Sequence, residues 1–141
     1  MNGRVLAVDP GDKRLGMAVS DPSGTIANPL TVIPHISRTI DAGAIAQLAN
    51  DHDVNLIVVG QALNDEGEVG PKARSAQRLA EAIRQQTAIA VELWDESGST
   101  RAARTTRFDM GVSRRKRSGH LDELAATVIL QSYLDAHAQP T

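Results

Sequence analysis

Four acidic side chains stand at the ends of predicted elements, where they could share one metal site. Asp9 ends an apolar run, Asp95 and Glu96 follow another, and Asp122 begins the last helical segment. In an open α/β sheet, ligands bind outside the carboxyl ends of the strands. Hard divalent ions take oxygen ligands, and two ions about 4 Å apart can hold the attacking and leaving oxygens of a phosphodiester. The pattern therefore predicts a Mg²⁺ or Mn²⁺ site with hydrolytic chemistry.

Each acid also has an ordinary structural interpretation. Asp9 precedes Pro10 and Gly11, which is typical of a turn, Asp95 could hold the turn after its strand, and Asp122 could cap a helix. The metal interpretation depends on the acids occurring together, and with a basic segment nearby.

Asp95 and Glu96 are adjacent, so on an extended strand their side chains point to opposite faces. Asp95 alternates with Leu93, and Glu96 alternates with Trp94. A glutamate reaches further from a strand end, which favours Glu96 as the metal ligand and Asp95 as the residue that fixes the following turn. Alternation alone does not identify the face that carries the site.

One segment of the chain is strongly basic. Residues 101–120 have a net charge of +6, whereas the other 121 residues have −8, giving −2 overall. The basic side chains of this segment are Arg101, Arg104, Arg107, Arg114, Arg115, Lys116 and Arg117. An acidic protein with one basic segment is expected to contact a polyanion locally, and the alternative is a solvated mobile loop.

The apolar pattern predicts five strands. Three short runs separated by turn residues, at 5–9, 15–20 and 25–33, are typical of an antiparallel meander. The uninterrupted run 56–60 predicts a central strand covered on both faces, and a last strand runs through 91–93 to Asp95.

Helical spacing follows between and after these strands. It predicts helices over 37–52, with Ser37 as the cap, then over 71–85, 100–108 and 122–136, whereas 111–119 is expected to be a loop rich in Gly, Ser and Arg. The fold class is α/β, a mixed five-stranded sheet flanked by helices. The predicted organisation is a single domain over residues 1–141.

Composition excludes several classes of function. The absence of cysteine rules out a disulfide framework, a thiolate zinc site and a cysteine nucleophile. Aromatic residues make up only 2%, which disfavours a face of stacked aromatics for single strands. No apolar run approaches the length of a membrane span and no signal-peptide pattern is present, so no membrane partner and a cytoplasmic location are expected.

The motifs resemble, in order, those of the YqgF/RuvX family of ribonuclease H-like proteins. The resemblance lies in AVDPG at 7–11, KRLGMAVSD at 13–21, VVG at 58–60, the pair Leu63-Asn64 with Gly67, Asp95-Glu96 with Ser99-Thr100, and LDELAA at 121–126. It covers nearly the whole chain and implies the ribonuclease H-like fold. It also implies a Mg²⁺- or Mn²⁺-dependent nuclease, acting as a Holliday junction resolvase or on the 5′ end of pre-16S rRNA.

Carried over by residue, the resemblance implies metal-binding and catalytic roles for Asp9, Asp122 and one of Asp95 and Glu96. Where the family has an arginine after the acidic pair, this chain has Ser97. The lysine often found near the last aspartate is also absent, and His120 is interpreted as a solvated loop residue. The residues expected to bind nucleic acid are Lys13, Arg14, Asn64, Arg101, Arg104, Arg114, Arg115, Lys116 and Arg117.

Three functions compete. The favoured one is a nuclease acting on branched DNA or precursor rRNA, and because a resolvase needs two symmetric sites, a homodimer is expected. A nucleic-acid-binding or ribosome-assembly factor without turnover is the alternative, favoured by Ser97. An ATP-binding sugar kinase or chaperone shares the Asp9-Pro10-Gly11 pattern, but the chain is too short for a second nucleotide-closing domain.

Overall fold

The computed structural model describes residues 3–62, 67–95 and 114–138, with side chains throughout except at 114–123. Five strands form one mixed sheet in the order β3-β2-β1-β4-β5. The strands are β1 (Arg4–Pro10), β2 (Arg14–Ser20), β3 (Ala27–Pro34), β4 (Val54–Gln61) and β5 (Ala90–Asp95). β1 pairs antiparallel with β2 and parallel with β4, β2 pairs antiparallel with β3, and β4 pairs parallel with β5. The predicted meander with two parallel strands is confirmed.

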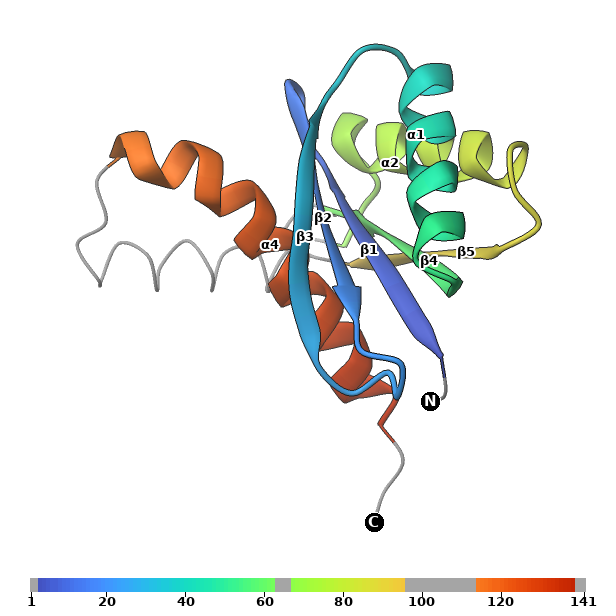
Figure 1. Ribbon diagram of the computed structural model, residues 1–141. Helices are drawn as coiled ribbons and strands as arrows, with labels where there is room; N and C mark the ends of the chain where they lie inside the picture. The colour runs from blue at the N-terminus through green and yellow to red at the C-terminus, as the bar shows by residue number, and fades with distance from the viewer. Residues whose placement is uncertain (1–2, 63–66, 96–113, 139–141) are drawn as a thin grey trace.

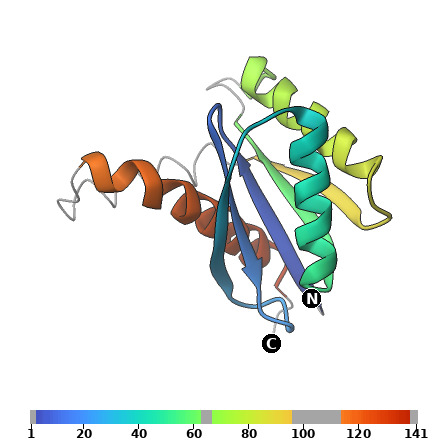
Figure 2. The same cartoon turned by 45° about the horizontal axis from the view of Figure 1, so that its top comes forward.

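Helices cover both faces of the sheet. Helices α1 (Arg38–Asp51) and α2 (Pro71–Arg84) lie on one face, and α4 (Arg114–Ala136) crosses the other (Figures 1 and 2). Each face has its own apolar core. Leu6 and Val8 of β1 pack toward α1 and α2, whereas Val5 and Ala7 pack with residues of α4. β1 therefore lies at the centre of the fold, buried on both faces.

Local chemistry explains the element boundaries. Ser37 caps α1 by accepting a hydrogen bond from the Ile40 N–H at 3.2 Å, as predicted. In the β1–β2 turn, a Cβ on Gly11 would lie 2.4 Å from the Arg14 carbonyl oxygen, so only glycine fits. Pro71 begins α2, where its missing N–H costs nothing.

Several predicted boundaries differ from the observed ones, most of them by one or two residues, among them β4, which begins at Val54 rather than at 56. Two of the differences have a clear physical reason. β3 begins at Ala27 rather than at 25, because the Asp21 carboxylate accepts hydrogen bonds from the N–H groups of Thr25 (2.8 Å) and Ile26 (3.0 Å) and keeps both residues in the turn. These bonds, with one from Ser23, lower the pKa of Asp21 to about 2. The second error concerns the last helix.

Helix α4 begins at Arg114, so the predicted loop over 111–119 is wrong from residue 114 onward. Arginine and lysine are good helix formers, and the run of four basic residues outweighs the single Gly119. The predicted helix over 100–108 lies outside the described residues. None of the helices in the described part of the chain has an apolar stretch long enough to cross a bilayer.

Candidate active site

Asp9 lies at the end of the central strand, on the face that α4 covers. Alternate residues of a strand share one face of the sheet. Val5 and Ala7 of β1 pack against α4, so Asp9, two residues after Ala7, lies on the same face. The next residue, Pro10, points to the opposite face, where it lines a pocket with residues of α1 and α2. Asp9 is half-buried, so its carboxylate is partly withdrawn from water at the edge of the sheet.

The neighbours of Asp9 at the same level of the sheet belong to β4 and β5. Val8 pairs with Val59, and Val59 with Leu93, so the next level of the sheet holds Asp9, Gly60 and Trp94. Gly60 is buried and has no side chain, so no side chain stands between Asp9 and Trp94 at this level of the sheet. Carboxylate oxygens such as those of Asp9 are the ligands that Mg²⁺ and Mn²⁺ prefer.

Asp95 belongs to the other face. It ends β5 opposite Gln61, and its alternation partners Val91 and Leu93 pack toward α1 and α2. Gln61 itself accepts a hydrogen bond at 3.2 Å from Gln77 of α2. Strand alternation therefore separates Asp95 from Asp9.

The residues on the Asp9 side of β5 contact α4 directly. The Trp94 indole N–H donates to Ser132 Oγ at 3.4 Å, and the Tyr133 hydroxyl donates to Glu92 at 2.7 Å. Burial and the neighbouring Glu92 raise the pKa of Tyr133 to about 12, so the phenol remains a donor at neutral pH. These contacts attach α4 to the strand end that carries the predicted acidic pair.

Position 122 lies in α4, eight residues before Leu130 and four before Ala126, and both of those residues are buried against the sheet. The side chain of Asp122 is outside the described set, and Glu96 lies outside the described residues altogether. Of the four predicted carboxylates, the structure thus places two side chains, on opposite faces. Within 3–62, 67–95 and 124–138, no group of three potential metal ligands comes together.

Of the predicted nucleic-acid-binding residues, too, the structure describes the side chains of only some. Lys13 and Arg14 are exposed in and after the β1–β2 turn, at the edge where Asp9 lies. The first residues of α4 are Arg114, Arg115, Lys116 and Arg117, whose side chains are not described. Asn64, Arg101 and Arg104 lie outside the described residues.

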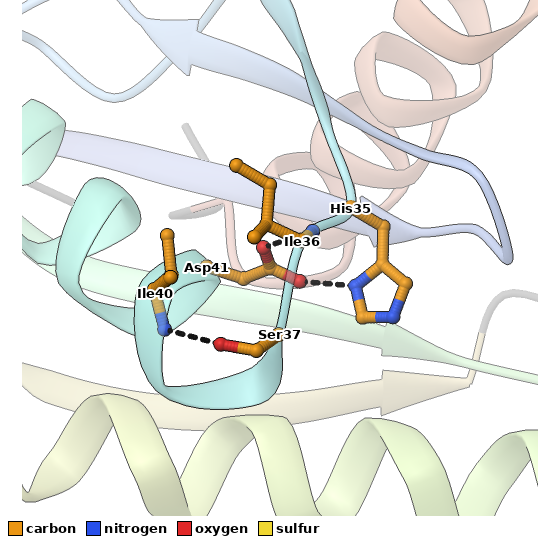
Figure 3. Close-up of polar contacts among 5 residues, drawn as sticks. All are labelled: His35, Ile36, Ser37, Ile40 and Asp41. Carbon is orange, nitrogen blue, oxygen red and sulfur yellow. Dashed lines mark hydrogen bonds and ion pairs between the residues drawn. The ribbon is translucent and has the colours of Figure 1, made fainter.

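Sequence reasoning missed an ordered His–Asp pair beside α1 (Figure 3). Asp41 is only 2% exposed, and one of its carboxylate oxygens accepts the Ile36 N–H at 3.0 Å. The other oxygen is hydrogen-bonded to Nδ1 of His35, whose side chain is 43% exposed. The available signal was an acid at position 41, four residues before the core residue Ile45, because an acid on an apolar helix face needs a buried partner.

Known proteins resemble this chain over most of its length. The family model for RuvX, described as Holliday junction resolvase, matches residues 3–136. A protein of Myxococcus xanthus named "Putative pre-16S rRNA nuclease" is 40% identical over 137 residues, which cover 97% of this chain and 91% of that relative. A protein of the same name from Thermoanaerobacter pseudethanolicus is 40% identical over 134 residues, covering 94% and 96%.

Solved structures share the fold at low sequence identity. The Thermus thermophilus RuvC in complex with a Holliday junction substrate superposes with a TM-score of 0.58 at 17% identity, covering 96% of this chain and 95% of RuvC. The Fowlpox virus resolvase bound to Holliday junction DNA gives 0.57 at 12% identity, covering 96% and 99%. The ribonuclease H-like fold and the prediction of a phosphodiester-hydrolysing nuclease family are confirmed, and the chain belongs to the RuvX family.

Proposed function

We propose that this protein is a divalent-metal-dependent nuclease that hydrolyses phosphodiester bonds in structured nucleic acid, either branched DNA or the precursor of 16S rRNA. The observation that carries the proposal is the half-buried carboxylate of Asp9 at the end of the central strand, on the face that α4 covers. The family match and the names of the relatives support the same activity.

Asp9, Glu96 and Asp122 are the residues we propose as metal ligands and catalytic residues. Asp9 shares its level of the sheet with Gly60, which has no side chain. Glu92 and Trp94 of β5 face α4, and strand alternation therefore favours position 96 over Asp95 for the face of Asp9. The bound ion, Mg²⁺ or Mn²⁺, would supply an activated water and charge stabilisation. The carboxylates would fix that water in line with the scissile bond.

The basic side chains would position the substrate around this site. Lys13 and Arg14 lie at the same sheet edge as Asp9, and Arg114, Arg115, Lys116 and Arg117 begin the helix that covers the Asp9 face. Contacts to phosphates fix the register of a nucleic acid without reading its sequence. We also propose a homodimer, which would supply two symmetric sites for a junction, and a cytoplasmic location.

Metal binding should stabilise the folded protein. Because the ion binds the folded state and relieves repulsion among the carboxylates, Mn²⁺ at 100 times its Kd should raise Tm by about 5–10 °C. Differential scanning fluorimetry with and without Mn²⁺ measures this shift. Asp9→Asn should lose the shift, and an equal shift in that variant would place the ion elsewhere.

Replacing Arg114, Arg115, Lys116 and Arg117 by glutamine should weaken nucleic-acid binding and flatten its salt dependence. The slope of log K against log[salt] should fall by about 0.9 for each duplex phosphate that the protein no longer neutralises. Fluorescence anisotropy across a salt series gives the slope. A control variant with Lys72, Arg74 and Arg78 of α2 changed to glutamine should retain it. Unchanged affinity and slope in the first variant would make this segment a solvated face.

The substrate is tested by comparing four-way junctions, flaps and 5′-extended precursor rRNA in two assays, cleavage with Mn²⁺ and binding in EDTA. We expect Mn²⁺-dependent cleavage of at least one of them at a defined position. Binding to all three substrates with no cleavage of any would instead indicate a binding factor.

A further inference from the structure

A pocket of about 360 Å³ lies on the opposite side of the sheet from the Asp9 face. Its apolar lining residues are Pro10, Leu15 and Leu79, and the two leucines belong to the core under α1 and α2. The rest of the lining is glycine and polar or charged residues. Its volume falls within the range of small-molecule sites.

The rim of this pocket carries hydrogen-bonding groups that the fold does not use. In the described part of the chain, neither the Arg38 guanidinium nor the Ser75 hydroxyl makes a hydrogen bond or ion pair, and both line the pocket. His35 also lines it, with Nδ1 held by the buried Asp41, so its Nε2 is the ring atom left for a ligand (Figure 3). Ser37 and one carboxylate oxygen of Asp41 accept backbone N–H groups at the start of α1, so helix capping accounts for their presence in the lining. Capping does not account for the side chains of His35 and Arg38.

The lining combines apolar, basic and acidic residues, and this combination indicates the class of ligand. A bare phosphate would not need apolar lining residues, and the positive charge of Arg38 is balanced by the acids Asp12 and Asp41 in the same lining. A nucleobase has an apolar face and an edge of alternating donors and acceptors. It fits a lining of leucine and proline with arginine, serine and histidine beside them.

The pocket lies next to the proposed site of hydrolysis. Its residues Pro10, Gly11 and Asp12 directly follow Asp9, and consecutive Cα atoms are about 3.8 Å apart. Asp9 and the pocket therefore lie on the two sides of one strand end. A nucleic-acid strand crossing this edge would bring the nucleotide beside the scissile phosphate over the pocket.

We propose that this pocket binds one unpaired nucleotide of the substrate, with its base on the apolar lining residues and its polar edge on Arg38, Ser75 and His35. The pocket would thereby select substrates that are unpaired next to the cut. This inference rests on the proposed nuclease function and adds a specificity site to it.

The test uses a substrate that the wild type cleaves, with an abasic nucleotide placed in turn at each position around the cut. At one position, loss of the base should raise KM about tenfold and leave kcat within about twofold. Ser75→Leu, an exposed helix position where leucine is a good helix former, should fill the pocket and raise KM similarly. In that variant, the abasic substitution should have no further effect.

Arg38→Gln should raise KM in the same direction, and Arg78→Gln is its matched control, since it removes the same charge from an exposed position outside the pocket. Equal KM values for the two arginine variants, together with no response to any abasic position, would overturn the inference. Cleavage by the wild type would remain intact in that case, so the proposed function would survive.

A second measurement is independent of turnover. The His35 imidazole signals should shift on addition of 5′-mononucleotides to the wild type but not to Ser75→Leu. If inorganic phosphate shifts the His35 signals identically, the pocket binds anions without recognising a base, and the proposal is overturned. Mononucleotide binding with no effect of the pocket variants on KM would indicate a free nucleotide as ligand, and would also contradict it.

Discussion

Asp9→Asn is expected to lower the rate of cleavage by at least about 100-fold without unfolding the protein. The amide keeps the shape of the carboxylate but removes the charge that would hold the ion, and metal sites tolerate such a loss poorly. Because the repulsion between Asp9 and the other carboxylates is removed, Tm in EDTA should be unchanged or slightly higher. Single-turnover cleavage in Mn²⁺ and thermal unfolding in EDTA measure the two effects.

Asp53→Asn is the matched control for this variant. Asp53 is exposed, precedes β4 at the other end of the sheet, and has a φ of 53°, a conformation that asparagine adopts readily. The control makes the same chemical change and should keep full activity and stability. Full activity in Asp9→Asn as well would contradict the proposed site.

The acidic pair after β5 should separate into two roles. Glu96→Gln is expected to lose cleavage by about 100-fold or more at unchanged Tm, because strand alternation favours position 96 for the face of Asp9. Asp95→Asn should retain most activity and cost at most about 1 kcal/mol of stability, since the exposed Asp95 alternates with Leu93 on the other face. The same cleavage and unfolding assays apply. Lost activity in Asp95→Asn with full activity in Glu96→Gln would assign the metal to Asp95.

Most of the fold could be predicted because local signals and burial agree. The run at 56–60 has no polar side chain because β4 is covered on both faces. Ser37 and Pro71 predict the starts of two helices, and in the structure Ser37 caps α1 and Pro71 begins α2. The start of α4 was missed because a basic run with serine and glycine is equally typical of a solvated loop. The apolar residues whose spacing indicates a helix, Leu124, Ala125, Val128 and Ile129, come only after this segment.

For the candidate site, the sequence predicts a kind of chemistry but not an arrangement of side chains. The sequence places acids at strand ends, but it does not specify which face of the sheet each strand end serves. That required the packing of Ala7 against α4 and of Leu93 toward α2. The His35–Asp41 pair depends on the end of β3 meeting the first turn of α1, a tertiary contact without a motif.

The most direct test of the account is the cleavage rate of the wild-type protein on a four-way junction and on 5′-extended precursor rRNA, measured as Mn²⁺ is titrated from zero in EDTA-treated protein. Metal-dependent nuclease activity predicts no cleavage without the ion and a rate that rises and saturates with Mn²⁺ on at least one substrate. Tight binding of both substrates with no cleavage at any Mn²⁺ or Mg²⁺ concentration would contradict it.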